Sequence, residues 1–167
     1  SDVCENAADF TLTEGAPAGG TYSGPGVSGN TFSPSSAGAG THTLTYSVTN
    51  GDGCTSTATQ TITVNAAPTP VISGPTESCL EGTGILMTPE NADHSYSWTV
   101  TGASIVNGAA AAELELSFDV AGSASVQLTE TNDITGCSSI TGTYEITVYG
   151  RPEIFEIQSD NEITRRE

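Results

Sequence analysis

The sequence predicts an all-β protein made of two diverged copies of one small module. Leu44, Tyr46 and Val48 alternate with hydroxyl residues before a Gly-rich turn, and residues 60–64 resume the alternation, as in a β-hairpin. Residues 126–148 repeat this pattern. The four cysteines also fall at matching places, one near the start of each copy and one directly after each hairpin turn.

The repeat sets the expected domain organisation. Thr-Asn, a short turn, Gly-Cys and Ile-Thr-Val occur in the same order in 49–64 and 131–148, and such internal repeats indicate tandem units. We expect one module at 1–67 and a second at 68–151, with 152–167 as a tail or the start of a third module. Disorder, the rival interpretation of so bland and acidic a chain, is disfavoured because the apolar residues follow repeated alternation and are not scattered.

The first module is predicted to hold short strands before its hairpin. Val27 and Phe32 are expected to fill the core edge, and residues 33–40 are predicted to form a loop because Pro34 disrupts strand pairing. The two prolines of the linker at 65–70 predict a short, semi-rigid spacer. The strands expected before the hairpin are 9–13 and 21–23.

The second module is predicted to contain an edge strand, a central strand and further alternating strands. Trp98 lies on the apolar face of the expected central strand, and Glu113 and Glu115 are expected to face solvent beside buried leucines. About seven strands separated by turn signals favour a β-sandwich of immunoglobulin type, in which a buried tryptophan commonly packs near a disulfide. The expected strands are 71–75 (edge), 84–87, 95–100 (central), 103–106, 114–118, 126–132 and 144–148.

The cysteines predict one disulfide in each module. The repeat favours Cys4–Cys54 and Cys79–Cys137, although four cysteines allow three connectivities. Such bridges would stabilise small modules by roughly 4 kcal/mol each and imply an oxidising, extracellular location. A zinc site is the alternative, but the chain has no Cys-x-x-Cys pair and its two histidines are distant in sequence from the cysteines.

The charge balance excludes several classes of partner. Twenty acidic residues against three arginines and no lysine give a net charge of −17, which repels nucleic acid and anionic membrane surfaces. No apolar run approaches a membrane span, so direct membrane insertion is not expected. The absence of lysine also excludes lysine isopeptide crosslinks.

Two groups of residues resemble known families. Residues 20–27, with 32–34 and Gly53-Cys54, resemble the Ig-like repeats of Bacteroidetes surface and secreted proteins; residues 97–102, with 129–132 and Gly136-Cys137, resemble their PKD-like modules. The resemblance covers roughly residues 1–150. It implies tandem extracellular β-sandwiches in long repetitive proteins, often gliding-motility or attachment adhesins exported by type IX secretion. Typical PKD domains carry Trp-x-Phe-Gly-Asp-Gly where this chain has Trp98-Thr99-Val100-Thr101-Gly102.

The titratable residues do not predict a catalytic site. His42 is interpreted as a solvent-facing strand residue and His94 as a loop residue, and no nucleophile elbow, phosphate loop or metal-binding histidine pair is present. Glu113 and Glu115 lie on one strand face, whereas glycosidase carboxylates oppose each other across a cleft. We therefore expect no enzymatic activity.

Calcium is the one cofactor that the acidic residues suggest. Asp52 in the first hairpin turn and Glu130 and Asp133 near the second are candidate oxygen ligands for Ca²⁺. The alternative is that Asp and Asn simply form turns there. Apart from this calcium hypothesis, no cofactor is expected.

Three functions fit these observations. The leading hypothesis is a stalk or spacer segment of a cell-surface adhesin whose partners are neighbouring repeats of the same chain. The second is a module that binds surface glycans or proteins through its loops. The third is an ancillary module of a secreted enzyme.

Overall fold

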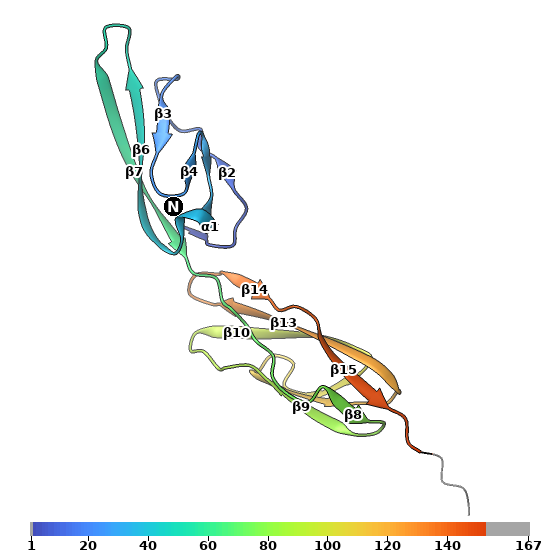
Figure 1. Ribbon diagram of the computed structural model, residues 1–167. Helices are drawn as coiled ribbons and strands as arrows, with labels where there is room; N and C mark the ends of the chain where they lie inside the picture. Colours follow the sequence, from blue (N-terminus) through green and yellow to red (C-terminus); the bar gives the residue numbers. More distant parts are fainter. Residues whose placement is uncertain (1, 153–167) are drawn as a thin grey trace, which may run out of the picture.

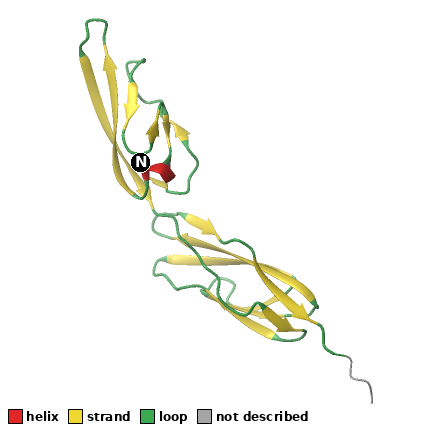
Figure 2. Cartoon of the chain, viewed as in Figure 1, coloured by secondary structure: helices red, strands yellow, loops and turns green. Residues whose placement is uncertain are grey.

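The computed structural model describes residues 2–152 and separates their strands into two groups. The strands of residues 2–65 form the N-terminal half, and those of residues 72–149 form the C-terminal half (Figure 1). Strands and loops make up nearly all of this part of the chain, and its one helix is the single turn α1 (Pro34–Ala37), as Figure 2 shows.

The N-terminal half contains seven strands in two sheets. One sheet has the order β1-β7-β6-β3 and the other β2-β5-β4. β1 runs parallel to β7, and all other neighbours are antiparallel. The strands are β1 (Asp2–Cys4), β2 (Phe10–Thr11), β3 (Thr21–Ser23), β4 (Val27–Ser28), β5 (Thr31–Phe32), β6 (Gly40–Thr49) and β7 (Thr55–Asn65).

The C-terminal half repeats this topology. One sheet has the order β10-β13-β15-β8, with β14 also paired to β13, and the other has the order β11-β12-β9. Again the first strand, β8, runs parallel to the last, β15. The strands are β8 (Glu77–Cys79), β9 (Thr83–Met87), β10 (His94–Thr101), β11 (Ser104–Asn107), β12 (Glu113–Ser117), β13 (Gly122–Asn132), β14 (Ser138–Ile140) and β15 (Tyr144–Tyr149).

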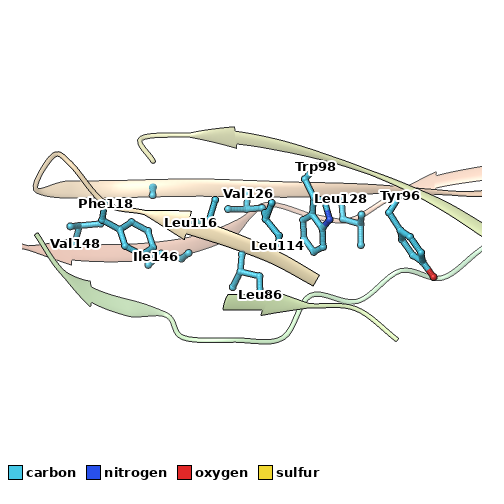
Figure 3. Packing of buried hydrophobic residues seen from close by; sticks show 11 residues of the cluster. Leu86, Tyr96, Trp98, Leu114, Leu116, Phe118, Val126, Leu128, Ile146 and Val148 are labelled. Carbon is cyan, nitrogen blue, oxygen red and sulfur yellow. The ribbon is translucent and has the colours of Figure 1, made fainter. Parts of the chain in front are cut away.

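Each half has its own hydrophobic core, and the two cores share no residue. The N-terminal core has four buried residues: Phe32, Leu44, Ile62 and Val64. Eleven buried residues form the C-terminal core between its two sheets (Figure 3). They are Leu86, Tyr96, Trp98, Leu114, Leu116, Phe118, Ala124, Val126, Leu128, Ile146 and Val148.

The structure confirms the all-β prediction and corrects several elements. Residues 71–75 form only one isolated bridge, Ser73 to Met87, because the strand that pairs with β15 is β8, further along the chain. Pro34 starts a helical turn in the predicted loop, where proline's fixed φ and missing N–H suit the first helical position. In the sheet with the order β10-β13-β15-β8, β10 is an edge strand and not the predicted central one.

Two further sequence interpretations can be compared with the structure. Leu114, Leu116 and Phe118 are fully buried, and Glu113 on the other face of β12 is exposed while Glu115 is half-buried. The prediction for 152–167 falls almost wholly outside the described residues.

Candidate functional site

A disulfide joins the two halves of the molecule. Cys4, the last residue of β1, is bonded to Cys137, which follows the turn after β13, with 5.5 Å between the Cα atoms. The bridge therefore links the segment where β1 and β7 end to the hairpin turn of the next half. Cys54 and Cys79 are free and exposed.

The predicted Cys4–Cys54 bridge is wrong because the two residues lie at opposite ends of β7. Cys4 pairs in register with Asn65 at the end of this strand, whereas Cys54 directly precedes its start. Eleven residues of strand span roughly 35 Å at about 3.3 Å per residue. A disulfide needs Cα atoms within about 7 Å.

The predicted Cys79–Cys137 bridge is wrong for the same reason. Cys79 pairs with Tyr149 at the end of β15, next to the start of β13, whereas Cys137 follows the end of β13. The length of β13 separates the two sulfurs. Both errors come from the parallel pairing of first and last strands, which carries the upstream cysteine to the base of each hairpin.

Polar contacts accompany the bridge. The side chain of Asn6 donates from Nδ2 to the carbonyl oxygen of Ser138 at 2.8 Å and to Ser139 Oγ at 3.3 Å. Asn6 lies in the turn after β1, which closes through a bond from Ala7 N to Cys4 O of 3.0 Å. A covalent bond and two hydrogen bonds thus fix the C-terminal hairpin against the end of the N-terminal half.

The hairpin turn that carries Cys137 is held by Asn132. Its Oδ1 accepts from the backbone N–H groups of Ile134 and Thr135, both at 3.0 Å, and its backbone N–H donates to Cys137 O at 2.9 Å. Gly136 has φ of 72°, a left-handed conformation that favours glycine. These bonds set the direction in which the Cys137 side chain leaves the hairpin.

Beside this turn lies a buried carboxylate. Glu130 is 2% exposed, and its Oε1 accepts from Asn91 Nδ2 at 2.7 Å and from His94 Nδ1 at 2.6 Å. Asn132 Nδ2 lies 3.0 Å from His94 Nε2, so the ring nitrogen facing Asn132 accepts while Nδ1 donates to the carboxylate. These hydrogen bonds connect the start of β10 to the end of β13, next to the turn that carries Cys137.

The two histidine interpretations need correction. His94 opens β10 and is partly buried in this network, so it is not a loop residue. His42 does lie on a strand, β6, but it is half-buried on the same face as Leu44, and its Nε2 bonds to Gly38 O at 2.8 Å. Sequence reasoning missed the Glu130–His94 contact because 36 residues separate the pair.

The calcium candidates lie on two different turns. Asp52 belongs to the β6–β7 turn, where Asn50 Oδ1 accepts from its backbone N–H, and Asp133 accepts from Ser95 Oγ at 2.7 Å. Glu130 is committed to His94 and Asn91. Within residues 2–152 no three His, Cys, Asp or Glu side chains gather as a metal site would require.

Trp98 lies in the core as predicted, but the described residues of its half contain no disulfide between two of their own cysteines. It is 7% exposed, and its indole N–H donates to Ala111 O at 2.8 Å. The expected neighbour, a bridge between Cys79 and Cys137, does not form. The prediction of a buried Trp98 is therefore confirmed, whereas the predicted Cys79–Cys137 disulfide beside it is wrong.

A groove lies on the N-terminal half. It has a volume of about 760 Å³, and the rings of Tyr22 and Tyr46 lie 4.8 Å apart beside it. Both phenol groups bond within the chain: Tyr46 donates to Pro17 O and accepts from Gly20 N, and Tyr22 accepts from Gly15 N. Among the lining residues are Phe10, Leu12, Tyr22, Leu44, Tyr46 and Gln60.

Among the described residues, no helix has the length and apolar character needed to cross a membrane, and α1 has only four residues.

Comparison with known proteins identifies the fold of the first half. Residues 1–63 match the model of a bacterial Ig domain. No curated protein matches the chain.

Solved structures of low similarity were also found. Murine CEACAM1b is 10% identical with a TM-score of 0.38, covering 66% of this chain and 58% of its own. The fibronectin(III)-like modules of Clostridium thermocellum CbhA are 13% identical with a TM-score of 0.36, covering 72% and 70%. Bacteroides ovatus SGBP-B, solved with a mixed-linkage heptasaccharide, is 16% identical with a TM-score of 0.31, covering 88% and 42%.

Proposed function

We propose that this chain is a non-catalytic extracellular spacer segment of a cell-surface adhesin, built from two tandem Ig-like modules at 1–67 and 68–151. The observation that carries the proposal is the Cys4–Cys137 disulfide. A bond between two units with separate cores adds little to either core, but it restricts how one unit moves relative to the other. That is the property a spacer requires.

Three other features support this role. The two units share one strand topology, and arrays of repeated units grow by the addition of further copies. The net charge of −17 disfavours non-specific association between chains displayed at high density. Disulfides persist in oxidising spaces outside the cytosol. Contribution to attachment or gliding would then belong to elements that the spacer positions.

Small-angle X-ray scattering tests the spacer role directly. The oxidised chain should fit one elongated shape, and the Cys4→Ser variant should require a broad set of interdomain angles. A matched control is Cys54→Ser, which removes an exposed free thiol and should scatter like the wild type. A wild-type curve as broad as that of Cys4→Ser would contradict the proposal.

Surface display is tested on the producing cells. Antibody raised against the purified chain should label intact cells, and external protease should remove the label. Label that appears only after cell lysis would contradict an extracellular location.

The groove favours one alternative function, a glycan- or protein-binding module. Its aromatic lining suits a ligand, although the tyrosine hydroxyl groups are already used within the chain. The purified chain should be tested against a glycan and matrix-protein panel, with calcium and with chelator. Saturable binding that Gln60→Ala or Phe10→Ala weakens would replace the spacer proposal, and calcium dependence would implicate the acidic turns.

A further inference from the structure

The two free cysteines occupy the same structural positions as the two bridged ones. Cys54 and Cys79 are exposed and unpaired within the described residues, but each is the counterpart of one partner in the Cys4–Cys137 bond. The comparison of backbone bonds and strand registers in the two halves establishes these counterparts.

Cys79 is the counterpart of Cys4. Each is the last residue of the first strand of its half and pairs with the end of the last strand: Cys4 with Asn65 and Cys79 with Tyr149. The residue after each cysteine donates its backbone N–H to the same partner at 2.8 Å: Glu5 to the carbonyl of Asn65, and Leu80 to the carbonyl of Tyr149. The following turn also closes alike, with Ala7 N to Cys4 O at 3.0 Å and Gly82 N to Cys79 O at 2.9 Å.

Cys54 is the counterpart of Cys137. Each follows a glycine with positive φ, 84° for Gly53 and 72° for Gly136. Each accepts at its carbonyl from the N–H of the asparagine that begins the turn, at 3.0 Å in the first half and 2.9 Å in the second. In both turns the Oδ1 of that asparagine accepts backbone N–H groups.

The two free thiols also lie at opposite ends of the molecule. The β6–β7 turn, which contains Cys54, lies at one extreme in Figure 1, and the end of β8, which is Cys79, lies near the other. The bridge joins the halves between these extremes. In each half, therefore, the cysteine after the hairpin turn lies at one end and the cysteine of the first strand lies at the other. The two halves carry them in the same order along the molecule.

We propose that Cys79 and Cys54 are the two halves of the same head-to-tail staple, so that Cys79 of one chain bonds to Cys54 of a second copy. The inference rests on the proposed spacer function and names its partner: a unit of the same kind, bound end to end. The clear difference from the internal junction is Glu81 in the place of Asn6. The Glu81 carboxylate, which pairs with Arg151, cannot donate to the backbone carbonyl of Thr55 as Asn6 donates to that of Ser138. It can accept from the hydroxyl group of Ser56, the counterpart of Ser139.

The chemistry is thiol–disulfide exchange with an oxidised small-molecule disulfide. The thiolate of Cys79 attacks one sulfur of glutathione disulfide and releases one glutathione thiolate. The thiolate of Cys54 from the second chain then attacks the Cys79 sulfur of the mixed disulfide and releases the second glutathione. Two protein thiols are oxidised, one glutathione disulfide is reduced to two thiols, and the two protons leave with them or with buffer.

The test uses the full chain in a glutathione redox buffer. Wild-type chain should form a ladder of linear oligomers on a non-reducing gel. Cys54→Ser and Cys79→Ser variants, labelled with different masses and mixed, should form a mixed dimer that contains one Cys79–Cys54 bond on peptide mapping. Exposed Cys-to-Ser changes are expected to leave folding intact.

The distribution of dimers decides the outcome. Random collision of exposed thiols gives as much mixed dimer as both symmetric dimers together, whereas matched ends raise the effective concentration of one pairing. We expect the mixed dimer to exceed the symmetric dimers by roughly tenfold or more, and X-ray scattering should show a shape about twice as long. A random distribution, or a mixed dimer folded side by side, would overturn the inference.

The internal bridge provides an independent control. If peptide mapping finds Cys4–Cys137 intact while Cys54 and Cys79 show no preference, the inference fails and the spacer proposal stands. If Cys4 and Cys137 are free thiols in the purified protein, the spacer proposal fails as well.

Discussion

The two halves share a topology but differ in how each hairpin is supported. In the N-terminal half, Leu44 is the one buried residue of β6, the counterpart of β13, and the core has four buried residues. Residues Thr55–Thr61 at the start of β7 are exposed. In the C-terminal half, alternate residues of β13 are buried from Ala124 to Glu130, and the turn residue Cys137 is fully buried. Cys137 is buried where it bonds to Cys4 of the other half, whereas the equivalent residue Cys54 is exposed. The comparison indicates that the cysteine after the hairpin turn becomes buried when it bonds to a neighbouring unit.

The largest effect should come from removing a core aromatic residue from each half. Phe32 and Phe118 are both fully buried, and Phe-to-Ala changes cost about 3–5 kcal/mol. Because the N-terminal core is so small, Phe32→Ala should unfold residues 2–65 and leave the C-terminal half folded. Phe118→Ala should destabilise only the C-terminal half. Amide NMR spectra separate the halves, and simultaneous loss of both in either variant would contradict independent cores.

The buried carboxylate should matter next. Glu130→Ala leaves the donors of Asn91 and His94 without their acceptor, which costs about 1–3 kcal/mol. Trp98, the only tryptophan of the chain, reports unfolding of this half by fluorescence in a urea titration. The matched change Val48→Ala, at the counterpart position in β6, should cost less because Val48 is only half-buried, and amide NMR spectra measure its effect on the N-terminal half. Equal stability of Glu130→Ala and wild type would remove the proposed role of the network.

Removing the bridge should have a smaller effect on each core. When both halves are folded, the bridge closes a loop through the short linker. When one half is unfolded, the bridge closes a loop several times longer, through the linker and the unfolded chain. The longer closure costs about 1–2 kcal/mol more entropy, so the bridge stabilises the folded half by that difference. Cys4→Ser should therefore lower the free energy of unfolding of each half by about that amount. Thermal unfolding of oxidised wild type and Cys4→Ser measures it. A change nearer the roughly 4–5 kcal/mol expected for a disulfide that crosslinks one cooperative core would show that the halves unfold together.

The smallest effect concerns a phenol next to Cys79. The hydrogen bond from Tyr149 to Glu77, together with the charge of Glu77, raises the pKa of Tyr149 above its ordinary value of 10.0. The neutral phenol is thus favoured in the folded chain, so its stabilising contribution is present below pH 10 and is lost as the pH rises through the raised pKa. Glu77→Gln should lower the pKa of Tyr149, as ultraviolet difference titration would show, whereas Glu81→Gln should leave it unchanged.

Local patterns were sufficient to predict much of the fold. The alternation at 44–49 and 60–64 lies within β6 and β7, and the apolar positions of 114–118 are all buried. Strands of two or three residues, such as β1 and β8, carry too little pattern to be recognised. Their parallel pairing with distant strands is set by tertiary contacts that the local sequence does not record.

The candidate site was harder to predict because it depends on contacts between the halves. Sequence identified all four cysteines and their repeated placement, but matching each upstream cysteine to the hairpin of its own module gave the wrong pairing. The correct partner depends on which end of the long hairpin each cysteine occupies. The length of β7 excludes a Cys4–Cys54 bond only once Cys4 is known to pair with Asn65, which the structure shows.

The internal disulfide also determines how the chain carries tension. A pull applied on either side of the bridge passes from Cys4 through the sulfur–sulfur bond to Cys137, bypassing everything in between. The two cysteines are 133 residues apart in sequence, so roughly 450 Å of extensible chain is held slack inside a covalent loop. Among the described strands, only β1, β14 and β15 lie on the direct path. Under oxidising conditions most of the protein cannot be stretched, and reduction of this one bond would release the stored length.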